Sequence, residues 1–192
     1  HNTQARVVKR VTGEDHDSVA AAQRLTETAI DAVVETVEEG KQRAAEHGAD
    51  LLADDDTLLV HDYSTTVLSA VTRAAEAGAS FTVYVTEARP RYLGRKMARR
   101  LAEFEAVDTH LLVDSASGHY LSECDRVVVG MDCIVEDTLY NRVGTYPLAA
   151  TAADAGVPVA VIGSAAKLVD TGFAFENEFR AASEVMREPA GT

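Results

Sequence analysis

The sequence predicts an α/β protein: a parallel sheet flanked by helices, with a short N-terminal helical extension. Between residues 57 and 163, short apolar runs alternate with longer segments whose apolar residues have helical spacing. Strands that alternate with helices in this way favour a parallel sheet with right-handed crossovers. The apolar runs are nearly continuous rather than alternating, which indicates strands buried on both faces.

The N-terminal part is expected to contain one long helix. Residues 1–16 are polar and mixed, and we expect a loose lead-in there. Asp17 and Ser18 are candidate N-caps, and Gly48 is the expected end of the helix. The apolar positions that keep helical spacing are Ala22, Leu25, Ala29, Ala32, Val33 and Val37. The division expected from this pattern is a helical extension over 1–50 and a Rossmann-like ligand-binding domain over 51–192.

Five strands and four helices follow in order. The apolar runs predict strands over 57–61, 81–86, 109–114, 126–130 and 158–163. Helices are predicted over 64–77, 94–105 and 144–155, with a short one near 118–121. Gly78 and Gly156 end two of them. The tail from Asp170 is expected to be irregular, with a short helix near 183–187.

Composition excludes several classes of protein. The 31 acidic and 18 basic residues give a net charge of −13, which argues against a broad basic face for nucleic acid. Many acids and only four lysines against 14 arginines are typical of adaptation to high salt. Two cysteines make neither a disulfide framework nor a metal-binding spacing, so we expect a reducing cytoplasm and no metal. No apolar run approaches the roughly 18 residues of a membrane span. The polar start gives no sign of a signal peptide, and its first residue, His1, indicates a processed or partial chain.

Polar residues follow each predicted strand, where ligands bind in an open parallel sheet. Two predicted helix starts, at Ser64 and at Gly144-Thr145, offer free N–H groups to a phosphate. The alternative is that Ser64 and Thr145 are ordinary N-caps. The candidate countercharges are Arg89, Arg95 and Lys167.

Single residues near these strand ends each have two interpretations. Asp132 is either a functional acid that binds sugar hydroxyls or moves a proton, or the cap of a turn. Cys133 is either a nucleophile or a small core residue, while Cys124 is expected only to pack. His61 is either an acid–base group or a hydrogen-bonded structural residue. Asp114 ends its strand much as Asp132 does.

Four motifs resemble signatures of the initiation factor 2B α/β/δ family. They are Val83-Tyr84-Val85-Thr86-Glu87-Ala88-Arg89-Pro90 with Gly94-Arg95, Asp114-Ser115-Ala116, Val129-Gly130-Met131-Asp132, and Asn141-Arg142-Val143-Gly144-Thr145-Tyr146. The resemblance covers about residues 57–170. The superfamily includes methylthioribose-1-phosphate isomerase and ribose-1,5-bisphosphate isomerase. The resemblance implies a Rossmann-like domain after a helical domain, and dimers that build larger assemblies.

The resemblance also implies roles for single residues. In the isomerases a Cys after the first strand and an Asp after the fourth move a proton as an aldose phosphate becomes a ketose. Here Asp62 stands at the position of the Cys, and Asp132 remains. Two carboxylates at one site repel, so that one takes up a proton or both need a cation. Arg89 and the 141–145 segment match positions that hold phosphate or sugar.

The regulatory subunits of initiation factor 2B also lack the Cys and commonly have Ser-Tyr-Ser after the His, where this chain has Asp62-Tyr63-Ser64. The leading hypothesis is therefore a non-catalytic, archaeal-type regulatory protein that binds a phosphorylated sugar or nucleotide and self-associates as a dimer or larger homo-oligomer. The alternative is an aldose–ketose isomerase that uses Asp62 or Cys133 with Asp132, and a third hypothesis is an assembly module with a vestigial pocket. Initiation factor 2 subunits are further expected partners, and no cofactor is expected. The expected ligand contacts are His61, Asp62, Tyr63, Ser64, Arg89, Asp114, Asp132, Asn141, Arg142, Gly144, Thr145 and Lys167.

Overall fold

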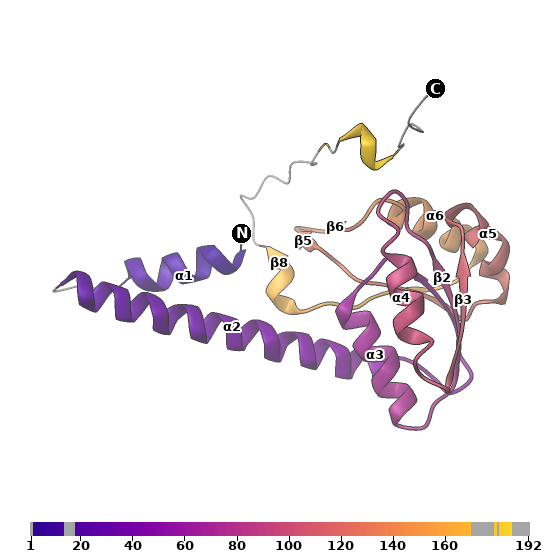
Figure 1. Ribbon diagram of the computed structural model, residues 1–192, viewed down its shortest axis with the longest axis horizontal. Coiled ribbons are helices and arrows are strands. Elements are labelled where there is room, and N and C mark those ends of the chain that lie inside the picture. Colours follow the sequence, from indigo (N-terminus) through magenta and orange to yellow (C-terminus); the bar gives the residue numbers. More distant parts are fainter. Residues whose placement is uncertain (1, 14–17, 170–178, 180, 186–192) are drawn as a thin grey trace, which may run out of the picture.

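The central sheet is parallel and has five strands in the order β3-β2-β1-β4-β7 (Figure 1). The computed structural model describes residues 2–13, 18–169, 179 and 181–185. The strands are β1 (Thr57–His61), β2 (Phe81–Thr86), β3 (Val107–Leu112), β4 (Arg126–Val129) and β7 (Val159–Val161). Every pairing among them is parallel, so the predicted fold class is confirmed.

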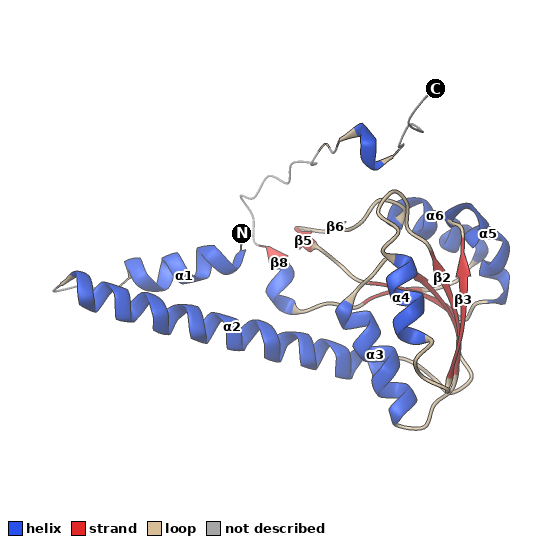
Figure 2. Cartoon of the chain, in the orientation of Figure 1, coloured by secondary structure: helices blue, strands red, loops and turns tan. Residues whose placement is uncertain are grey.

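Helices cover both faces of this sheet (Figure 2). They are α3 (Thr65–Glu76), α4 (Gly94–Leu101), α5 (Ser117–Tyr120) and α6 (Thr145–Ala155). The described residues also form short 3₁₀ turns, η1 (Asp114–Ala116), η2 (Leu121–Glu123), η3 (Ala165–Lys167) and η4 (Ala182–Glu184). Successive residues of β1 point to opposite faces: Leu58 and Val60 pack with α3 and α4, and Leu59 packs with α6. Each fully buried Leu or Val contributes roughly 1.5–3 kcal/mol relative to an exposed one.

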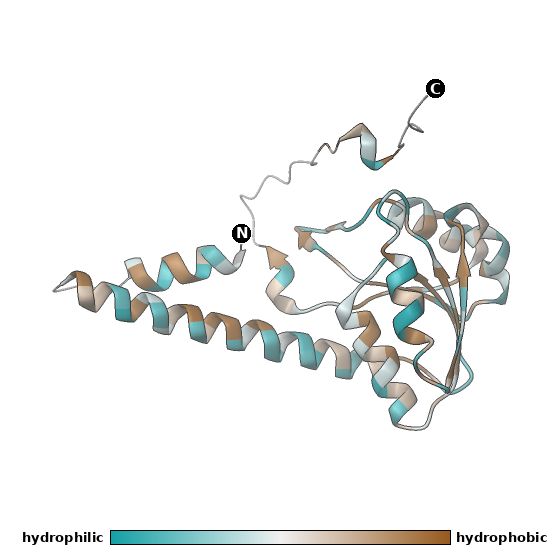
Figure 3. Cartoon of the chain, viewed as in Figure 1, coloured by the Kyte–Doolittle hydropathy of each residue, from teal (hydrophilic) through white to brown (hydrophobic). Residues whose placement is uncertain are grey.

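Burial on both faces holds for the inner strands and fails at the edges. In β1 and β4 every residue after the first is buried. In the edge strands Leu111 is 50% exposed and Val161 is 41% exposed. A continuous apolar run therefore identified these edge strands correctly but overstated their burial. Figure 3 shows the hydrophobic strands beside the mostly hydrophilic α4. Its arginines, Arg95, Arg99 and Arg100, are exposed.

The N-terminal extension is a pair of helices, which corrects two predictions. The lead-in contains the helix α1 (Asn2–Thr12), which packs against α2 (Val19–Asp50). Val7 and Val11, one helical turn apart, are its half-buried residues. Ser18 is the N-cap of α2, as expected, and accepts a hydrogen bond from the N–H of Ala21 at 3.2 Å.

Gly48 lies inside α2 and does not end it. It is buried, and a Cβ there would lie 2.9 Å from both the Cβ of Ala70 on α3 and Cδ1 of Ile162. The glycine therefore serves close packing of α2 on the sheet unit, which a sequence pattern does not distinguish from a helix stop. α2 packs against α3, so the helical extension and the sheet unit are in contact. The domain boundary near residue 50 therefore stays a prediction.

A second, small sheet follows β4, where the sequence suggested only a polar loop. It consists of β5 (Cys133–Val135), β6 (Thr138–Tyr140) and β8 (Leu168–Val169), with β5 and β6 joined as a hairpin. Strands this short leave no periodic signal in a sequence. At the C-terminus, η4 overlaps the predicted short helix at 183–187, and 186–187 and the predicted irregular segment 170–178 lie outside the described residues. None of the helices in the described part of the chain is long and apolar enough to cross a membrane.

Candidate ligand-binding site

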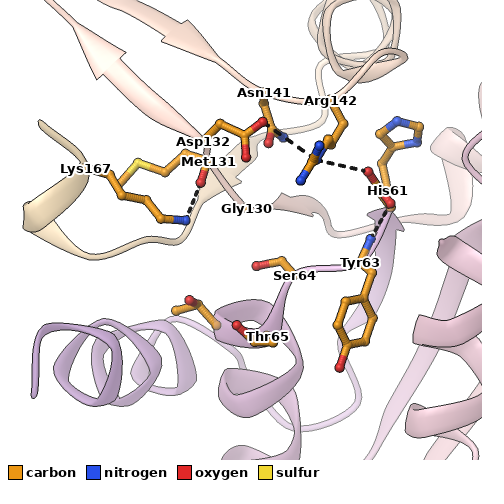
Figure 4. A pocket seen from close by; sticks show the side chains of 12 residues that line it. His61, Tyr63, Ser64, Thr65, Gly130, Met131, Asp132, Asn141, Arg142 and Lys167 are labelled. Carbon is orange, nitrogen blue, oxygen red and sulfur yellow. Dashed lines mark hydrogen bonds and ion pairs between the residues drawn. The ribbon is translucent and has the colours of Figure 1, made fainter. Parts of the chain in front are cut away.

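A polar cavity of about 160 Å³ opens at the carboxyl ends of β1 and β4 (Figure 4). The chain leaves β1 toward β2 on one side and later returns to β4 on the other, so this is the point where strand order reverses. Such points hold ligands in open α/β sheets. The lining residues are His61, Asp62, Tyr63, Ser64, Thr65, Thr66, Gly130, Met131, Asp132, Asn141, Arg142 and Lys167.

Arg142 lies between two carboxylates in this cavity. Its Nε is 3.7 Å from Oδ2 of Asp62 and 3.6 Å from Oδ2 of Asp132. Two carboxylates at one site repel each other unless one is protonated or a cation lies near both, and the Arg142 guanidinium is that cation. The Asp132 side chain is 44% exposed and that of Asp62 only 9%, so Asp132 is the more accessible acid.

The backbone at Asp62 has an uncommon conformation. Its φ is +64°, in the left-handed region that Asp tolerates because its short side chain bonds locally. Here Oδ1 accepts a hydrogen bond from the N–H of Tyr63 at 2.7 Å. Residues held in this region concentrate at functional sites. The turn brings the Asp62 carboxylate from the end of a buried strand to the cavity.

Lys167 contributes a second cation from η3. Its Nζ donates a hydrogen bond to the main-chain carbonyl of Met131 at 2.5 Å. Burial lowers the pKa of the Lys167 ammonium, and the negative charge of Asp132 opposes that shift. The ammonium group therefore stands next to the Asp132 loop, where it can meet an anionic ligand.

The start of α3 forms another wall. Ser64 is its N-cap, because Oγ accepts a hydrogen bond from the N–H of Val67 at 3.3 Å. Thr65 and Thr66, in the first turn, line the cavity. Gly130 approaches Ser64 so closely that a Cβ would lie 2.6 Å from the serine Oγ. A phosphate at this wall would meet free N–H groups and hydroxyls.

Several residues predicted to bind ligand lie outside this cavity. Asp114 accepts hydrogen bonds from the N–H groups of Ala88 and Arg89, both at 2.7 Å. The Arg89 guanidinium donates to the carbonyl of Val185 at 2.8 Å, so it faces the C-terminal segment rather than the cavity. Arg95 forms an ion pair with Glu87 at 2.6 Å.

The second predicted phosphate site, at Gly144-Thr145, does not line this cavity either, and phosphate binding there stays a prediction. The Oγ1 of Thr145 accepts a hydrogen bond from Nδ2 of Asn141 at 3.1 Å and thus orients that amide at the cavity. A separate cavity of about 270 Å³ lies beyond His61. Its lining includes Thr86, Asp114, Ser115, Ser117, Gly118, Gly144, Pro147, Leu148 and Thr151.

Four lining residues were not among the predicted contacts: Thr65, Thr66, Gly130 and Met131. A glycine at the end of a buried strand, where two main chains approach closely, is the signal that identifies Gly130. Met131 offers its main-chain carbonyl rather than its side chain to Lys167, and nothing in the sequence marks that role.

Neither cysteine lines the cavity. Burial and, to a lesser extent, Asp132 raise the pKa of the Cys133 thiol, which keeps it protonated at neutral pH. Burial raises the pKa of Cys124 to about 11. Since the thiolate is the nucleophile, this arrangement does not favour the use of Cys133 with Asp132.

Cys133→Ser is therefore expected to leave phosphosugar binding unchanged, and iodoacetamide is expected to modify Cys133 more slowly than free cysteine at pH 7. The rate should rise as the pH increases, because the thiol ionises only above its usual range. Mass spectrometry of the modified peptide gives the rate. Rapid alkylation at pH 7, together with loss of binding in the serine variant, would contradict this assignment.

A Rossmann-like sheet with a polar cavity at its switch point is typical of α/β proteins that bind small molecules. The model of the initiation factor 2 subunit family matches residues 2–190, and the chain belongs to this family. The family expected from the four motifs is thereby confirmed.

The curated relatives have two kinds of name. Ribose 1,5-bisphosphate isomerase of Haloferax volcanii is 38% identical over 143 residues, which are 72% of this chain and 44% of that protein. The protein of the same name in Haloterrigena turkmenica is 33% identical over 180 residues, 92% of this chain and 55% of that protein. A putative translation initiation factor eIF-2B subunit 2-like protein of Pyrococcus horikoshii is 35% identical over 123 residues, 64% of this chain and 44% of that protein. The chain spans about half the length of these relatives.

Solved structures agree with the fold. The translation initiation factor eIF-2B of Pyrococcus horikoshii superposes with a TM-score of 0.76 at 27% identity, over 87% of this chain and 58% of that one. 5-Methylthioribose 1-phosphate isomerase from the same organism gives a TM-score of 0.75 at 22% identity, over 95% of this chain and 55% of that one, and shows the fold alone.

Proposed function

We propose that the cavity binds a phosphorylated sugar and that the protein is an aldose–ketose isomerase of the ribose 1,5-bisphosphate type. The observation that carries the proposal is the placement of Arg142 between the carboxylates of Asp62 and Asp132. The names of the curated relatives support this isomerase alternative better than the leading non-catalytic hypothesis.

The chemistry of the lining suits such a ligand. Carboxylates and the Asn141 amide bind sugar hydroxyls, and the first turn of α3 with Lys167 binds phosphate. Nearly all of these groups are polar, so the cavity favours a hydrophilic ligand over an apolar one.

The isomerisation needs a proton for the ring oxygen and a base at C2. C1 of the sugar carries a phosphate, so there is no free aldehyde, and the reaction begins when the bond between C1 and the ring oxygen breaks and the ring oxygen takes up a proton from water. In our proposal Asp132 removes the proton from C2, which leaves an enol phosphate whose C2 oxygen is stabilised by Arg142. Asp132 then returns this proton to C1, while the C2 hydroxyl loses its own proton to water and becomes the ketone. The proton lost from the hydroxyl replaces the one taken up by the ring oxygen, so atoms and electrons balance.

A second candidate is a non-catalytic, regulatory protein that binds a phosphorylated sugar or nucleotide. The observation that favours it is Asp62, which stands where the isomerases of the superfamily have a cysteine, together with the lack of a thiol in the described lining. Both candidates use the same cavity and differ only in turnover.

The test is to incubate the chain with ribose 1,5-bisphosphate, and separately with methylthioribose 1-phosphate, in concentrated NaCl and to follow ketose formation by NMR. Ketose formation supports the isomerase. No ketose, but a rise in melting temperature, supports the non-catalytic candidate, because ligand at 100 times its Kd stabilises by about 2.7 kcal/mol. Neither ketose nor stabilisation overturns both and leaves the assembly module with a vestigial pocket.

Self-association is part of the proposal. One structural neighbour, at 19% identity, is a chain of a tetrameric eIF2B complex from C. thermophilum, which makes association plausible for this fold. We propose a homo-oligomer, with initiation factor 2 subunits as further partners, in a cytoplasm of high salt. Light scattering at low and high NaCl measures the oligomeric state.

A further inference from the structure

The His61 ring uses both of its nitrogens within the protein. Nδ1 lies 2.6 Å from Oγ1 of Thr86, and Nε2 lies 2.7 Å from the carbonyl oxygen of Val143. His61 is 4% exposed and Thr86 is 1% exposed. In Figure 4 the ring lies beside Arg142, on the side away from Asp132 and Lys167. The ring therefore has no free polar atom to offer a ligand.

These two contacts define the tautomer of the ring. A carbonyl oxygen only accepts hydrogen bonds, so Nε2 carries the hydrogen that is donated to Val143. In the neutral ring Nδ1 then has the lone pair and accepts the hydroxyl hydrogen of Thr86. Thr86 is the parallel partner of His61 on β2, so the sheet itself holds the two side chains together.

The contact with Val143 reaches the residue next to Arg142. On the other side of Val143, Gly144 has a φ of +101° and lies against the ring, where a Cβ would be 2.5 Å from Cε1 and Nε2. Ring and loop are thus fixed by one hydrogen bond and one close contact. Asp62 directly follows His61, and Arg142 directly precedes Val143, the hydrogen-bond partner of His61. His61 therefore links the two segments that carry the Asp62–Arg142 ion pair.

We propose that His61 is a positioning residue: through Thr86 on one side and Val143 on the other, it holds the 141–144 loop so that Arg142 lies between Asp62 and Asp132. It does so without a hydrogen bond to the ligand, because both ring nitrogens have partners within the protein. The part that concerns ligand affinity rests on the proposed function, whereas the part that concerns ring and loop does not.

The first test concerns the ring and needs no ligand. Nitrogen NMR of the imidazole in the wild-type chain, recorded at a pH at which the ring is neutral, is expected to show the hydrogen on Nε2. Hydrogen on Nδ1, or rapid averaging of both tautomers, overturns the proposal.

The second test uses a nearly isosteric pair at Thr86, which lies outside the ligand cavity. Thr86→Val removes the hydroxyl, and Thr86→Ser keeps it. The valine variant is expected to keep the hydrogen on Nε2, because the Val143 carbonyl still accepts it, but to exchange the amide hydrogen of Thr145 roughly tenfold faster and to bind ribose 1,5-bisphosphate roughly tenfold more weakly. The serine variant is expected to match the wild type in both exchange and binding. Equal exchange in both variants overturns the proposal.

A third comparison replaces the ring itself. His61→Gln keeps an amide that can donate to Val143, whereas His61→Leu has no donor. Faster exchange at Thr145 is expected in the leucine variant and not in the glutamine variant. If amide exchange at Thr145 is as predicted but the wild type binds no phosphosugar, the proposed function is wrong and the positioning role of His61 still holds. The same exchange in both variants counts against the role of His61.

Discussion

Asp132→Asn is expected to lower kcat for ribose 1,5-bisphosphate isomerisation by roughly 10²–10⁴-fold, the contribution typical of a positioned acid–base group. The amide is nearly the same size as the carboxylate and still forms hydrogen bonds, so affinity should change by less than about tenfold, or 1.4 kcal/mol. Steady-state kinetics and calorimetric titration separate the two effects.

The matched control is Asp137→Asn. Asp137 is an exposed residue in the turn of the β5–β6 hairpin, and it does not line the cavity. The Asp137→Asn substitution removes the same charge from the same part of the chain. Its kcat should remain within about twofold of the wild-type value, since distant surface charges have small effects. Equal kcat values for Asp132→Asn and the wild type would exclude Asp132 as the base.

The second large effect is expected at Gly94, the first residue of α4. A Cβ there would lie 1.8 Å from the main-chain oxygen of Thr86 and 2.9 Å from the main-chain carbon of Glu87. These are main-chain atoms of a buried strand end, and the clash cannot be relieved by a rotamer change. Gly94→Ala should therefore lower the free energy of unfolding by about 3 kcal/mol or more, at the upper end for overpacking.

Chemical denaturation measures this change, with Gly118→Ala as the control. At Gly118 the nearest atom to a new Cβ is Cγ2 of Thr151 at 3.5 Å, an ordinary contact. That variant should be neutral or more stable by up to about 1 kcal/mol, because alanine is the better helix former. If Gly94→Ala and the wild type have the same free energy of unfolding within error, α4 can shift away from the end of β2 to accommodate the new Cβ. That result would contradict the close packing at Gly94.

The sequence was sufficient for the inner part of the fold. The strands β1 and β2 have the predicted ends, because nearly continuous apolar runs mark strands that are buried on both faces. The edge strand β3 starts and ends two residues earlier than predicted, at Val107 and Leu112, because its exposed side weakens the pattern. α1 was missed because its sequence is mostly polar: among its residues with a described exposure, only Val7 and Val11 are half-buried.

The position of the cavity was predictable where it follows from strand ends. The carboxyl ends of parallel strands meet at one edge, and this rule correctly placed Asp62, Asp132 and Lys167 together. The same rule did not place Arg89, whose main-chain N–H is held by Asp114 and whose side chain is turned to Val185, and a ligand-binding role for any of these residues stays a prediction. The contact between His61 and Val143 joins residues 82 positions apart, and no local pattern contains that information.

The most direct test of the central claim is a crystal of this chain soaked with ribose 1,5-bisphosphate. We predict density for the sugar phosphate in the cavity between β1 and β4, with a phosphate near Lys167 and the first turn of α3. The sugar hydroxyls should lie near Asp62, Arg142 and Asp132. An empty cavity at saturating ligand, or density beside Arg89 instead, would contradict the account.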